Sequence, residues 1–397
     1  MTPRADDIVG KLAIRLTHDG ERVTGVNIDS SRPLRVARLL EGKPVDAALK
    51  LVPLLYTICG ESQAAAAVSA CEQALGLEVE PTQQRARRIL LDLETLREHL
   101  WRVFVDWPKV LRLKPRPEWL APLLSVQTTL RGVVSPSGSL FGLGGGEIAM
   151  PPATTIAKLH ALDQHLVEHL FGSEAAALLA GDRLPGPERG GMVGRCLAEL
   201  SGSEWLSLEG ELLPALEELT DAQWHALLDG EDAFLARPEI DNQPRETSPL
   251  TRQRQHPLVQ RGLEAWGPGP GVRLLARAVE VTAVLRRLQV NVARLGGARP
   301  FAQTRAPGGR GLGIVEAARG RLVHQLDQRD GRVTRYRILA PTEWNLHPRG
   351  VLARALLRLE QPRPSGLRAL VKVLVTAVDP CVDWQLDLRS GELSAVG

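Results

Sequence analysis

The stretch that decides the fold is GLGIVEAARGRLVHQLDQRDGRVTRYRILAPTEWNLHPR, residues 311–349. Its middle predicts a β-hairpin over 320–339. An apolar run from Leu322 to Leu326 leads into Asp330-Gly331, and a second run returns from Val333 to Leu339. The Asp-Gly pair supplies the positive backbone angles that a tight turn requires.

A second hairpin is predicted over residues 11–29, near the N-terminus. Its turn is His18-Asp19-Gly20-Glu21. Before this turn Leu12, Ile14 and Leu16 alternate with polar residues, as in a half-buried strand. After it, Val23, Val26 and Ile28 continue the apolar pattern on the return strand.

Most of the remaining chain predicts helix. Apolar residues recur at helical spacing over 84–106, 154–171 and 271–295, and an alanine-rich helix is expected over 62–76. The polar, proline-bearing stretch 236–260 predicts a long loop. The expected class is α+β, mainly helical with small hairpins, in a single domain over 1–397. Its parts are a hairpin (11–29), a helical core (62–295), a second hairpin (320–339) and a C-terminal segment (371–397).

Composition excludes several classes of protein. With 397 residues, 44% of them apolar, the chain can bury a large core. A net charge of +3 gives no electrostatic case for nucleic acid as a partner. The four cysteines are too sparse for a disulfide framework. No apolar run reaches the roughly 18 residues of a membrane helix. The N-terminus does not have the pattern of a signal peptide. We therefore expect a soluble cytoplasmic protein with no membrane insertion.

Two cysteine motifs near opposite ends of the chain carry the candidate chemistry. Cys59-Gly60-Glu61-Ser62 opens the alanine-rich helix, and a cysteine at a helix N-terminus has a lowered pKa, which suits a metal ligand. Cys381 follows Asp379-Pro380, after a strand or buried segment at 371–378. Each motif alone is typical of a small core residue. Two such motifs near opposite ends of a chain are typical of a protein that binds a metal between its two terminal segments.

Several segments, in order and spacing, resemble the large subunit of nickel–iron hydrogenases. The stretch 311–349 carries the strongest agreement: 313–320 resembles the family's Glu-Ala-Pro-Arg-Gly, and 340–349 resembles Pro-Thr-Thr-Trp-Asn-x-x-Pro-Arg. Four further segments match the family in the same order. They are Leu40-Glu41-Gly42-Lys43 before Cys59-Gly60, Asp106-Trp107 at a helix end, 246–252, and Asp379-Pro380-Cys381. The region 110–235 matches poorly.

The departures from the family bear directly on its chemistry. Family members bind nickel and iron through two thiolates from each motif, but here the second positions are Ser62 and Trp384. The motif histidines fall on Ala66 and Asp387, and the proton-relay glutamate falls on Ala37. Serine is a poor ligand for a soft metal and tryptophan cannot ligate one. The resemblance therefore implies that no stable two-metal centre forms.

Five retained residues define the candidate site. By the resemblance, Arg319 matches the arginine over the family's active-site iron, and Asp106 and Asp379 match two acidic residues near it. Cys59 and Cys381 match the cysteines that bind nickel terminally, not those that bridge to iron. The alternative is that these residues are held by packing alone, with Arg319 and Asp379 as a buried structural ion pair.

This pattern resembles that of the HupK/HoxV-type hydrogenase expression or formation proteins. The resemblance implies a non-catalytic assembly protein with no stably bound cofactor, which transiently holds iron with its cyanide and carbonyl ligands. The implied partners are hydrogenase maturation chaperones or the hydrogenase large subunit. The alternative is a metal-free docking module that mimics the large subunit.

Two other features are expected to carry no function. His160, His165 and His169 lie on one helix, and the last two have the i,i+4 spacing of a metal site, but we interpret them as a solvated helix face. The glycine-rich stretch 141–146 lacks the context of a phosphate-binding loop and predicts an ordinary loop.

Overall fold

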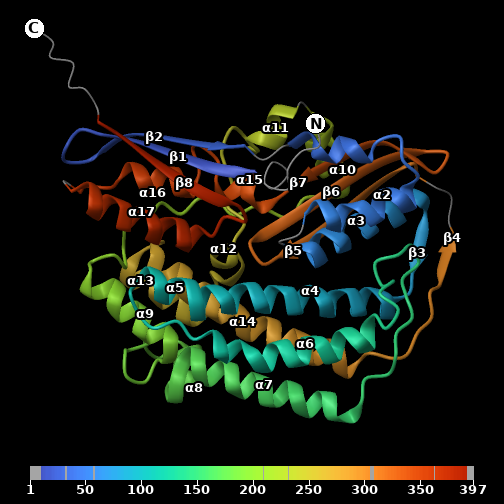
Figure 1. Cartoon of the computed structure of the whole chain (residues 1–397), viewed down its shortest axis with the longest axis horizontal. Helices are drawn as coiled ribbons and strands as arrows, with labels where there is room; N and C mark the ends of the chain where they lie inside the picture. The colour runs from blue at the N-terminus through green and yellow to red at the C-terminus, as the bar shows by residue number, and fades with distance from the viewer. Residues whose placement is uncertain are drawn as a thin grey trace, which may run out of the picture.

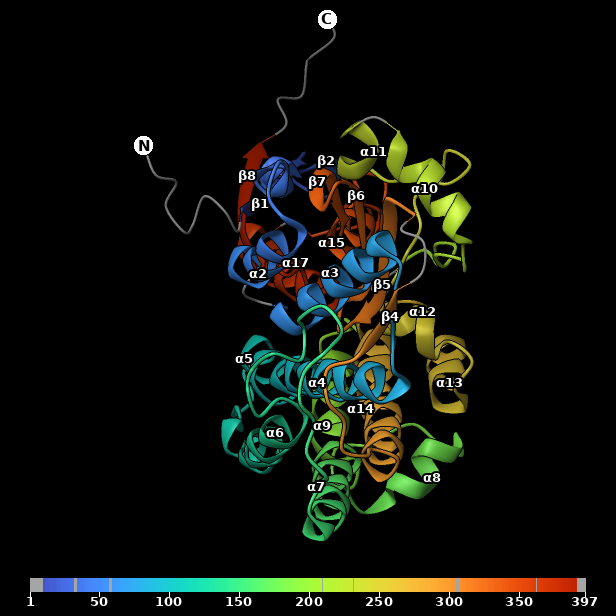
Figure 2. The ribbon, with the colours of Figure 1, turned by 90° about the vertical axis from the view of Figure 1, so that its right-hand side faces the viewer.

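The computed structural model describes residues 10–31, 34–56, 59–208, 210–230, 232–304, 308–361 and 363–390. The elements form two layers (Figure 1). A layer of long helices lies below, and two small sheets with their covering helices lie above. The same division is seen after a quarter turn (Figure 2). This arrangement confirms the predicted α+β class.

Two long helices form the centre of the lower layer. Helix α4 (Pro81–Trp101) packs along α14 (Pro270–Ala293), and α6 (Ala121–Val134), α7 (Ala153–Phe171) and α9 (Gly191–Gly202) complete the bundle. Both central helices begin with proline, whose fixed φ suits the first helical turn. Helix α4 continues into a π-helical segment, η2 (Arg102–Asp106), and then α5 (Trp107–Val110). The predicted helices are confirmed.

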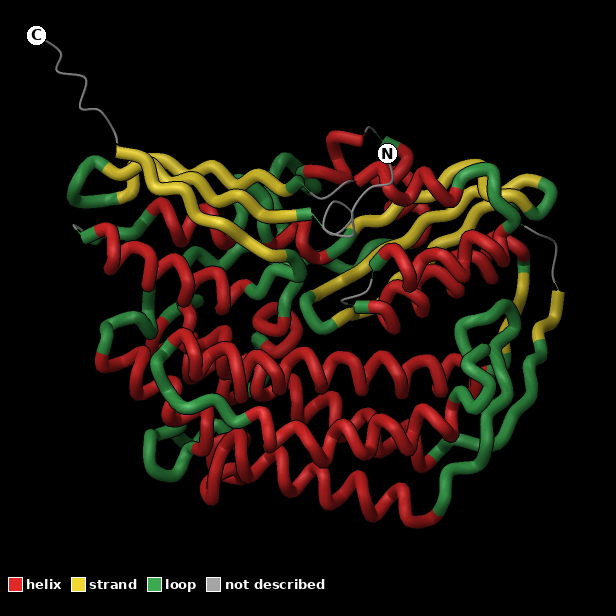
Figure 3. The backbone as a smooth tube through the Cα atoms, viewed as in Figure 1, coloured by secondary structure: helices red, strands yellow, loops and turns green. Residues whose placement is uncertain are grey.

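The first sheet joins the two ends of the described chain. Strands β1 (Lys11–His18) and β2 (Val23–Ser30) form the predicted hairpin, and β8 (Asp383–Ser390) pairs with β1 in parallel. The order is β2-β1-β8 (Figure 3). The segment that carries Cys381 is therefore tied to the start of the chain by a strand pair.

The second sheet has the order β5-β6-β7, with β5 (Arg310–Ala317), β6 (Gly320–Arg329) and β7 (Arg332–Leu339). Its hairpin confirms the prediction, and Asp330 and Gly331 both have positive φ. Helix α3 (Gly60–Leu75) packs directly on β5. A Cβ atom on Gly313 would lie 1.8 Å from the Ala66 carbonyl oxygen, so this close approach requires glycine.

One sequence prediction needs correction, and one open alternative is decided. The segment 371–378, expected as a strand or a buried segment, is buried and forms the C-terminal half of helix α17 (Pro364–Val378). The stretch 236–260 is not a continuous loop, because it contains α12 (Pro249–Gln253) and the start of α13 (Pro257–Trp266). In both cases packing against α14 stabilises a helix that the local pattern does not predict.

The other elements are short, and no described helix is both long and apolar enough to cross a membrane. They are η1 (Leu34–Leu40), α2 (Val45–Leu55), β3 (Leu77–Val79), η3 (Pro117–Leu120), η4 (Gly172–Glu174), α8 (Ala175–Ala180), α10 (Asp221–Asp229), α11 (Asp232–Ala236), β4 (Ala302–Thr304), α15 (Pro341–Asn345) and α16 (Val351–Leu357).

Candidate functional site

The two cysteines of the motifs differ from the other two thiols. Cys59 stands just before α3 and Cys381 stands between α17 and β8, and both are partly exposed. Cys71 and Cys196 are buried in the core, and burial raises the pKa of each thiol to about 12. Only the motif cysteines are therefore accessible for chemistry among the four.

Arg319 lies within electrostatic reach of both motif thiols. Burial acts to lower the pKa of Arg319, but Asp379, Glu98, Cys381 and Cys59 together raise it above its ordinary value. Its Nη2 donates to Glu98 Oε2 at 3.1 Å. Its Nε lies 3.5 Å from Asp379 Oδ1 but forms no hydrogen bond within the described part of the chain. The guanidinium is thus anchored at one nitrogen and retains a buried N–H without an acceptor.

Asp379 is the buried centre of a cluster of arginines. It ends α17 in the left-handed conformation, with φ of 62°. Arg277 Nη1 donates to its Oδ2 at 2.8 Å, and Arg102 Nε lies 2.6 Å from its Oδ1. Burial would raise the pKa of Asp379, but Arg319, Arg277 and Arg102 hold it well below its usual range. The Arg319–Asp379 ion pair considered above exists, although it is the longest of the three contacts.

Asp106 belongs to the rim of this cluster. It pairs with Arg102, which in turn reaches Asp379, and its side chain is partly exposed. The π-helical turn of η2 brings Arg102 and Asp106 to one side of the helix, and such turns often occur at functional sites. Asp106 therefore acts on the site through Arg102, and no contact between Asp106 and Arg319 is seen among the described residues.

The backbone of Arg319 is held by the very segments that carry the family resemblance. Asn345 Nδ2 donates to the Arg319 carbonyl at 3.1 Å and to the Thr247 carbonyl at 2.6 Å, and Asn345 Oδ1 accepts from Thr247 N at 3.0 Å. Gly320 has φ of 140°, and a Cβ atom there would lie 2.3 Å from the Thr247 carbonyl oxygen. The segments 246–252, 313–320 and 340–349 thus form one interlocked unit that sets the position of Arg319.

Each motif cysteine has a polar neighbour. Thr342 Oγ1 lies 2.7 Å from Cys381 Sγ, and either atom can donate. Gln63 Nε2 donates to Cys59 Sγ at 3.7 Å. Behind Gln63 lies a buried relay, in which His324 Nε2 is 2.9 Å from Gln63 Oε1 and His324 Nδ1 is 2.8 Å from the Tyr336 hydroxyl. Both sulfurs are therefore held in defined polar surroundings.

The positions that correspond to the family's other metal ligands carry different residues in this chain, with their own contacts. Ser62 is fully buried and donates its hydroxyl to Glu94, which also accepts from the backbone N–H of Glu61 and Ser62 at the start of α3. Burial raises the pKa of Glu94 to about 7. Trp384 is part of β8, opposite Leu12. The second position of the first motif thus carries a hydroxyl that is already donated to a buried carboxylate of α4.

The three remaining substituted positions are structural. Ala66 packs under β5, and Ala37 lies in the core with no acidic side chain. Asp387 is exposed and pairs with Arg389 at 3.0 Å.

The donor set around the site is small. No group of three or more His, Cys, Asp or Glu side chains that could hold a metal occurs among the described residues. The two motifs offer two thiols, and the neighbouring Thr342 adds one hydroxyl next to Cys381; thiolates suit a soft metal.

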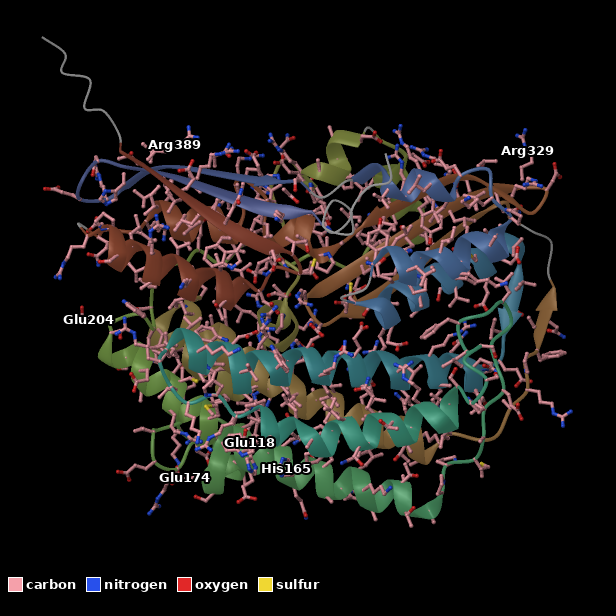
Figure 4. The ribbon with its side chains drawn as sticks, viewed as in Figure 1. Glu118, His165, Glu174, Glu204, Arg329 and Arg389 are labelled. Carbon is pink, nitrogen blue, oxygen red and sulfur yellow. The ribbon has the colours of Figure 1, made fainter. Side chains whose placement is uncertain are left out.

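The interpretation of the three histidines on α7 needs a partial correction. His160 is exposed, as expected, but His165 and His169 are half-buried on Trp119. His165 Nε2 lies 3.1 Å from the Trp119 carbonyl oxygen, and the His169 ring centroid lies 4.2 Å from that of Trp119. Figure 4 places His165 in the lower layer. The i,i+4 spacing here serves packing.

The glycine-rich stretch 141–146 is a loop, as predicted. Two of its backbone N–H groups are occupied by the side chains of Glu72 and Gln83, which leaves them no role in holding a phosphate.

Sequence reasoning did not identify five residues of the site. Arg102 and Gln63 could have been found, because each lies four residues from a named residue on the same helix. Thr342 lies inside the 340–349 segment. Arg277 and Glu98 carry no local signal, since they reach the site only through the packing of α14 and α4. These five residues are Arg102, Arg277, Glu98, Gln63 and Thr342.

Comparison with known proteins agrees with this geometry. Residues 272–356 match the family described as nickel-dependent hydrogenase. The chain is 32% identical to the hydrogenase expression/formation protein HupK of Bradyrhizobium diazoefficiens, over 90% of this chain and 91% of that protein. It is 30% identical to the hydrogenase expression/formation protein HoxV of Cupriavidus necator, over 94% of this chain and 95% of that protein. Its fold is similar to that of the nickel–iron–selenium hydrogenase of Desulfovibrio vulgaris Hildenborough, with a TM-score of 0.65 and 15% identity over 92% of this chain and 94% of that chain.

Proposed function

Because the chain belongs to the family of hydrogenase expression/formation proteins, we propose that it is a non-catalytic assembly protein for the maturation of a nickel–iron hydrogenase. In this role it receives an iron fragment that carries cyanide and carbonyl ligands, holds it briefly, and passes it to the hydrogenase large subunit. The iron fragment is cargo, not a cofactor of this chain. Its partners are the maturation chaperone that supplies the fragment and the large subunit that accepts it.

The observation that carries the proposal is the state of Arg319. Its guanidinium is buried and lies within electrostatic reach of Cys59 and Cys381, and its Nε, although 3.5 Å from Asp379 Oδ1, forms no hydrogen bond among the described residues. A buried donor left unpaired costs free energy of about 1–3 kcal/mol. A cyanide nitrogen would satisfy it through a charge-assisted hydrogen bond. A purely structural ion pair with Asp379 would not require an unused donor beside two thiols.

Temporary binding follows from the number of thiols. Cys59 and Cys381 can hold iron. Ser62 stands where the family has a further cysteine, and its hydroxyl is already donated to Glu94. Fewer thiolate bonds mean a smaller barrier to release, which a carrier needs. The retained cysteines correspond in the resemblance to the nickel-terminal positions, so the iron would sit differently here than in the large subunit.

Infrared spectroscopy on the intact purified chain tests this proposal. The protein should be taken from cells that are making a nickel–iron hydrogenase. We expect absorption from cyanide and carbonyl groups bound to iron, and its loss in the variant Cys59→Ala/Cys381→Ala. The control variant Cys71→Ala/Cys196→Ala removes two thiols that lie in the core and should keep the bands. Absence of the bands from the wild-type protein would refute the carrier role.

A metal-free docking module is the alternative, and one observation favours it. The chain has the large-subunit fold, whereas its described residues contain no group of three metal-binding side chains. In this version the chain binds maturation chaperones by its shape alone. Hydrogenase activity in a strain that produces only the Cys59→Ala/Cys381→Ala variant separates the two. Full activity would support docking, and loss of activity would support the carrier.

A further inference from the structure

A basic cleft of about 1000 Å³ lies between α5 and α17, beside the candidate site. Its lining includes two carboxylates, Asp106 and Glu199. It also includes five cationic side chains, which are Arg102, Lys109, Arg112, Arg368 and Lys372. The chain as a whole carries nearly balanced charge. This local excess of positive charge is therefore a property of the cleft and not of the composition.

Four of these five cations are not engaged in an ion pair in the part of the chain that the structure describes. Lys109, Arg112, Arg368 and Lys372 are exposed, and none forms an ion pair or side-chain hydrogen bond within the described ranges. Only Arg102 is engaged, with Asp106 and Asp379. Like charges gathered around a concave surface repel each other and raise its positive potential. Such a surface becomes more favourable when an anionic group enters it.

The fold aligns the cations on two facing elements. Arg368 and Lys372 are four residues apart and so share one side of α17. Lys109 belongs to α5, which packs on α17, and Arg112 follows it with φ of 60°. Ser365 and Gly366, in the first turn of α17, also line the cleft, where the positive end of the helix dipole adds to the field. The positive charge is spread along both walls.

We propose that this cleft binds a carboxylate-rich peptide segment of a partner protein. Because the cations are distributed over two walls, an extended chain with several carboxylates can pair with all of them at once, whereas one small anion reaches only a few. Trp205 and Trp384 also line the cleft and offer ring surface to the aliphatic parts of such a segment. The inference deepens the proposed function and rests on it only for the identity of the partner as a maturation protein.

Position links the cleft to the cysteine site. Arg102 lines the cleft and at the same time lies 2.6 Å from Asp379, which precedes Cys381 by two residues. A segment bound in the cleft would therefore hold its protein next to Cys381. Its carboxylates would also compete with Asp106 and Asp379 for Arg102. The cleft is thus suited to bring a partner to the place where cargo would be exchanged.

A binding measurement with a fluorescein-labelled peptide of ten glutamates tests the proposal. Fluorescence anisotropy with the full chain should show binding that weakens steeply as salt is raised. The variant Arg368→Glu/Lys372→Glu should weaken it at least tenfold. The matched control is Lys158→Glu/Arg329→Glu, which changes the net charge equally at exposed positions on α7 and at the end of β6, where Figure 4 labels Arg329. It should stay within twofold of the wild-type protein.

Three results would overturn the assignment. Equal weakening by both double variants would mean that overall charge, and not the cleft, attracts the peptide. Equal binding of a ten-glutamine peptide would exclude charge recognition. Displacement by equimolar inorganic pyrophosphate would assign the cleft to a small anion. None of these measurements involves iron, so failure of the cleft proposal is distinguishable from failure of the carrier proposal, which infrared spectroscopy decides.

Discussion

Arg277 Nη1 donates a hydrogen bond to Asp379 Oδ2 at 2.8 Å, and both side chains are almost wholly buried. Arg277 lies in the long helix α14, whereas Asp379 ends α17. The contact therefore links the helical layer to the segment that carries Cys381. It also keeps Asp379 ionised in the interior, with Arg102 and Arg319 as further partners.

We predict that Asp379→Asn strongly destabilises the protein. The change keeps the side-chain shape, and asparagine accepts the left-handed backbone found there. It leaves the buried Arg277 without its counter-charge and removes one of the two carboxylates that face Arg319. Loss of one partner of a buried ion pair costs about 3–5 kcal/mol. The midpoint of urea unfolding measures the effect. Asp106→Asn is the control, since its pair with Arg102 is partly exposed and should contribute less than about 1 kcal/mol.

Acidification should act through the same carboxylate. The pKa of Asp379 is lowered in the folded protein, so its contribution to stability is present above its ordinary pKa of 3.8 and is lost as the pH falls below that value. Asp379→Asn should therefore reduce the loss of stability between about pH 4 and pH 2. An unchanged acid profile in the variant would contradict this assignment.

Glu94 should have the opposite pH dependence. Burial raises its pKa from 4.5 to about 7, so the folded protein holds the proton more tightly than the unfolded chain. Its contribution favours folding below pH 4.5 and declines as the pH rises to about 7, by up to roughly 3 kcal/mol. Glu94→Gln cannot titrate and should flatten this part of the stability curve. Thermal unfolding between pH 4.5 and pH 8 checks it.

The relay behind Cys59 should control the reactivity of that thiol. Burial raises the pKa of Tyr336 well above its ordinary value, so its hydroxyl stays protonated and donates to His324 Nδ1. His324 Nε2–H then donates to Gln63 Oε1, which turns the Gln63 N–H toward Cys59. Tyr336→Phe removes the first donor and frees the tautomer of His324. Losing one net hydrogen bond of 0.5–1.5 kcal/mol should slow alkylation of Cys59 by about two- to tenfold.

Cys381 provides the internal control for that measurement. Its sulfur contacts Thr342 and forms no hydrogen bond with a member of the relay among the described residues, so its alkylation rate should not change in Tyr336→Phe. Cys71 and Cys196, with a pKa of about 12, should not react in the folded protein. Mass spectrometry of iodoacetamide-treated protein separates the four sites. Parallel slowing at Cys59 and Cys381 would indicate a general structural change instead of a relay.

Gly320→Ala should displace Arg319 and destabilise the fold. The new Cβ atom would lie 2.3 Å from the Thr247 carbonyl oxygen at a φ of 140°, so both space and backbone oppose it. We expect a loss of about 2–4 kcal/mol in unfolding free energy. Gly331→Ala, at positive φ but with open space around it, should cost only about 1–2 kcal/mol. Similar losses in the two variants would show that the contact with Thr247 is unimportant.

Local sequence patterns were sufficient for the regular elements that rest on local interactions. Asp330-Gly331 predicts the second hairpin because only a few residues accept its backbone angles, and helical periodicity predicts α4, α7 and α14. The same reasoning left 371–378 open between a strand and another kind of buried segment, because a run of buried apolar residues is compatible with either a strand or a helix. Contact with α14 decides that choice, and no local pattern records it.

What the sequence by itself determined is therefore the α+β class, the hairpins, and the selective retention of Cys59, Cys381, Arg319 and Asp379. The tertiary structure alone decided which of these residues meet. Arg277 and Asp379 are 102 positions apart and come together because α14 and α17 pack against each other. The physical reason is that dihedral preferences and periodicity act over a few residues, whereas a buried carboxylate takes its partners from whichever helices enclose it.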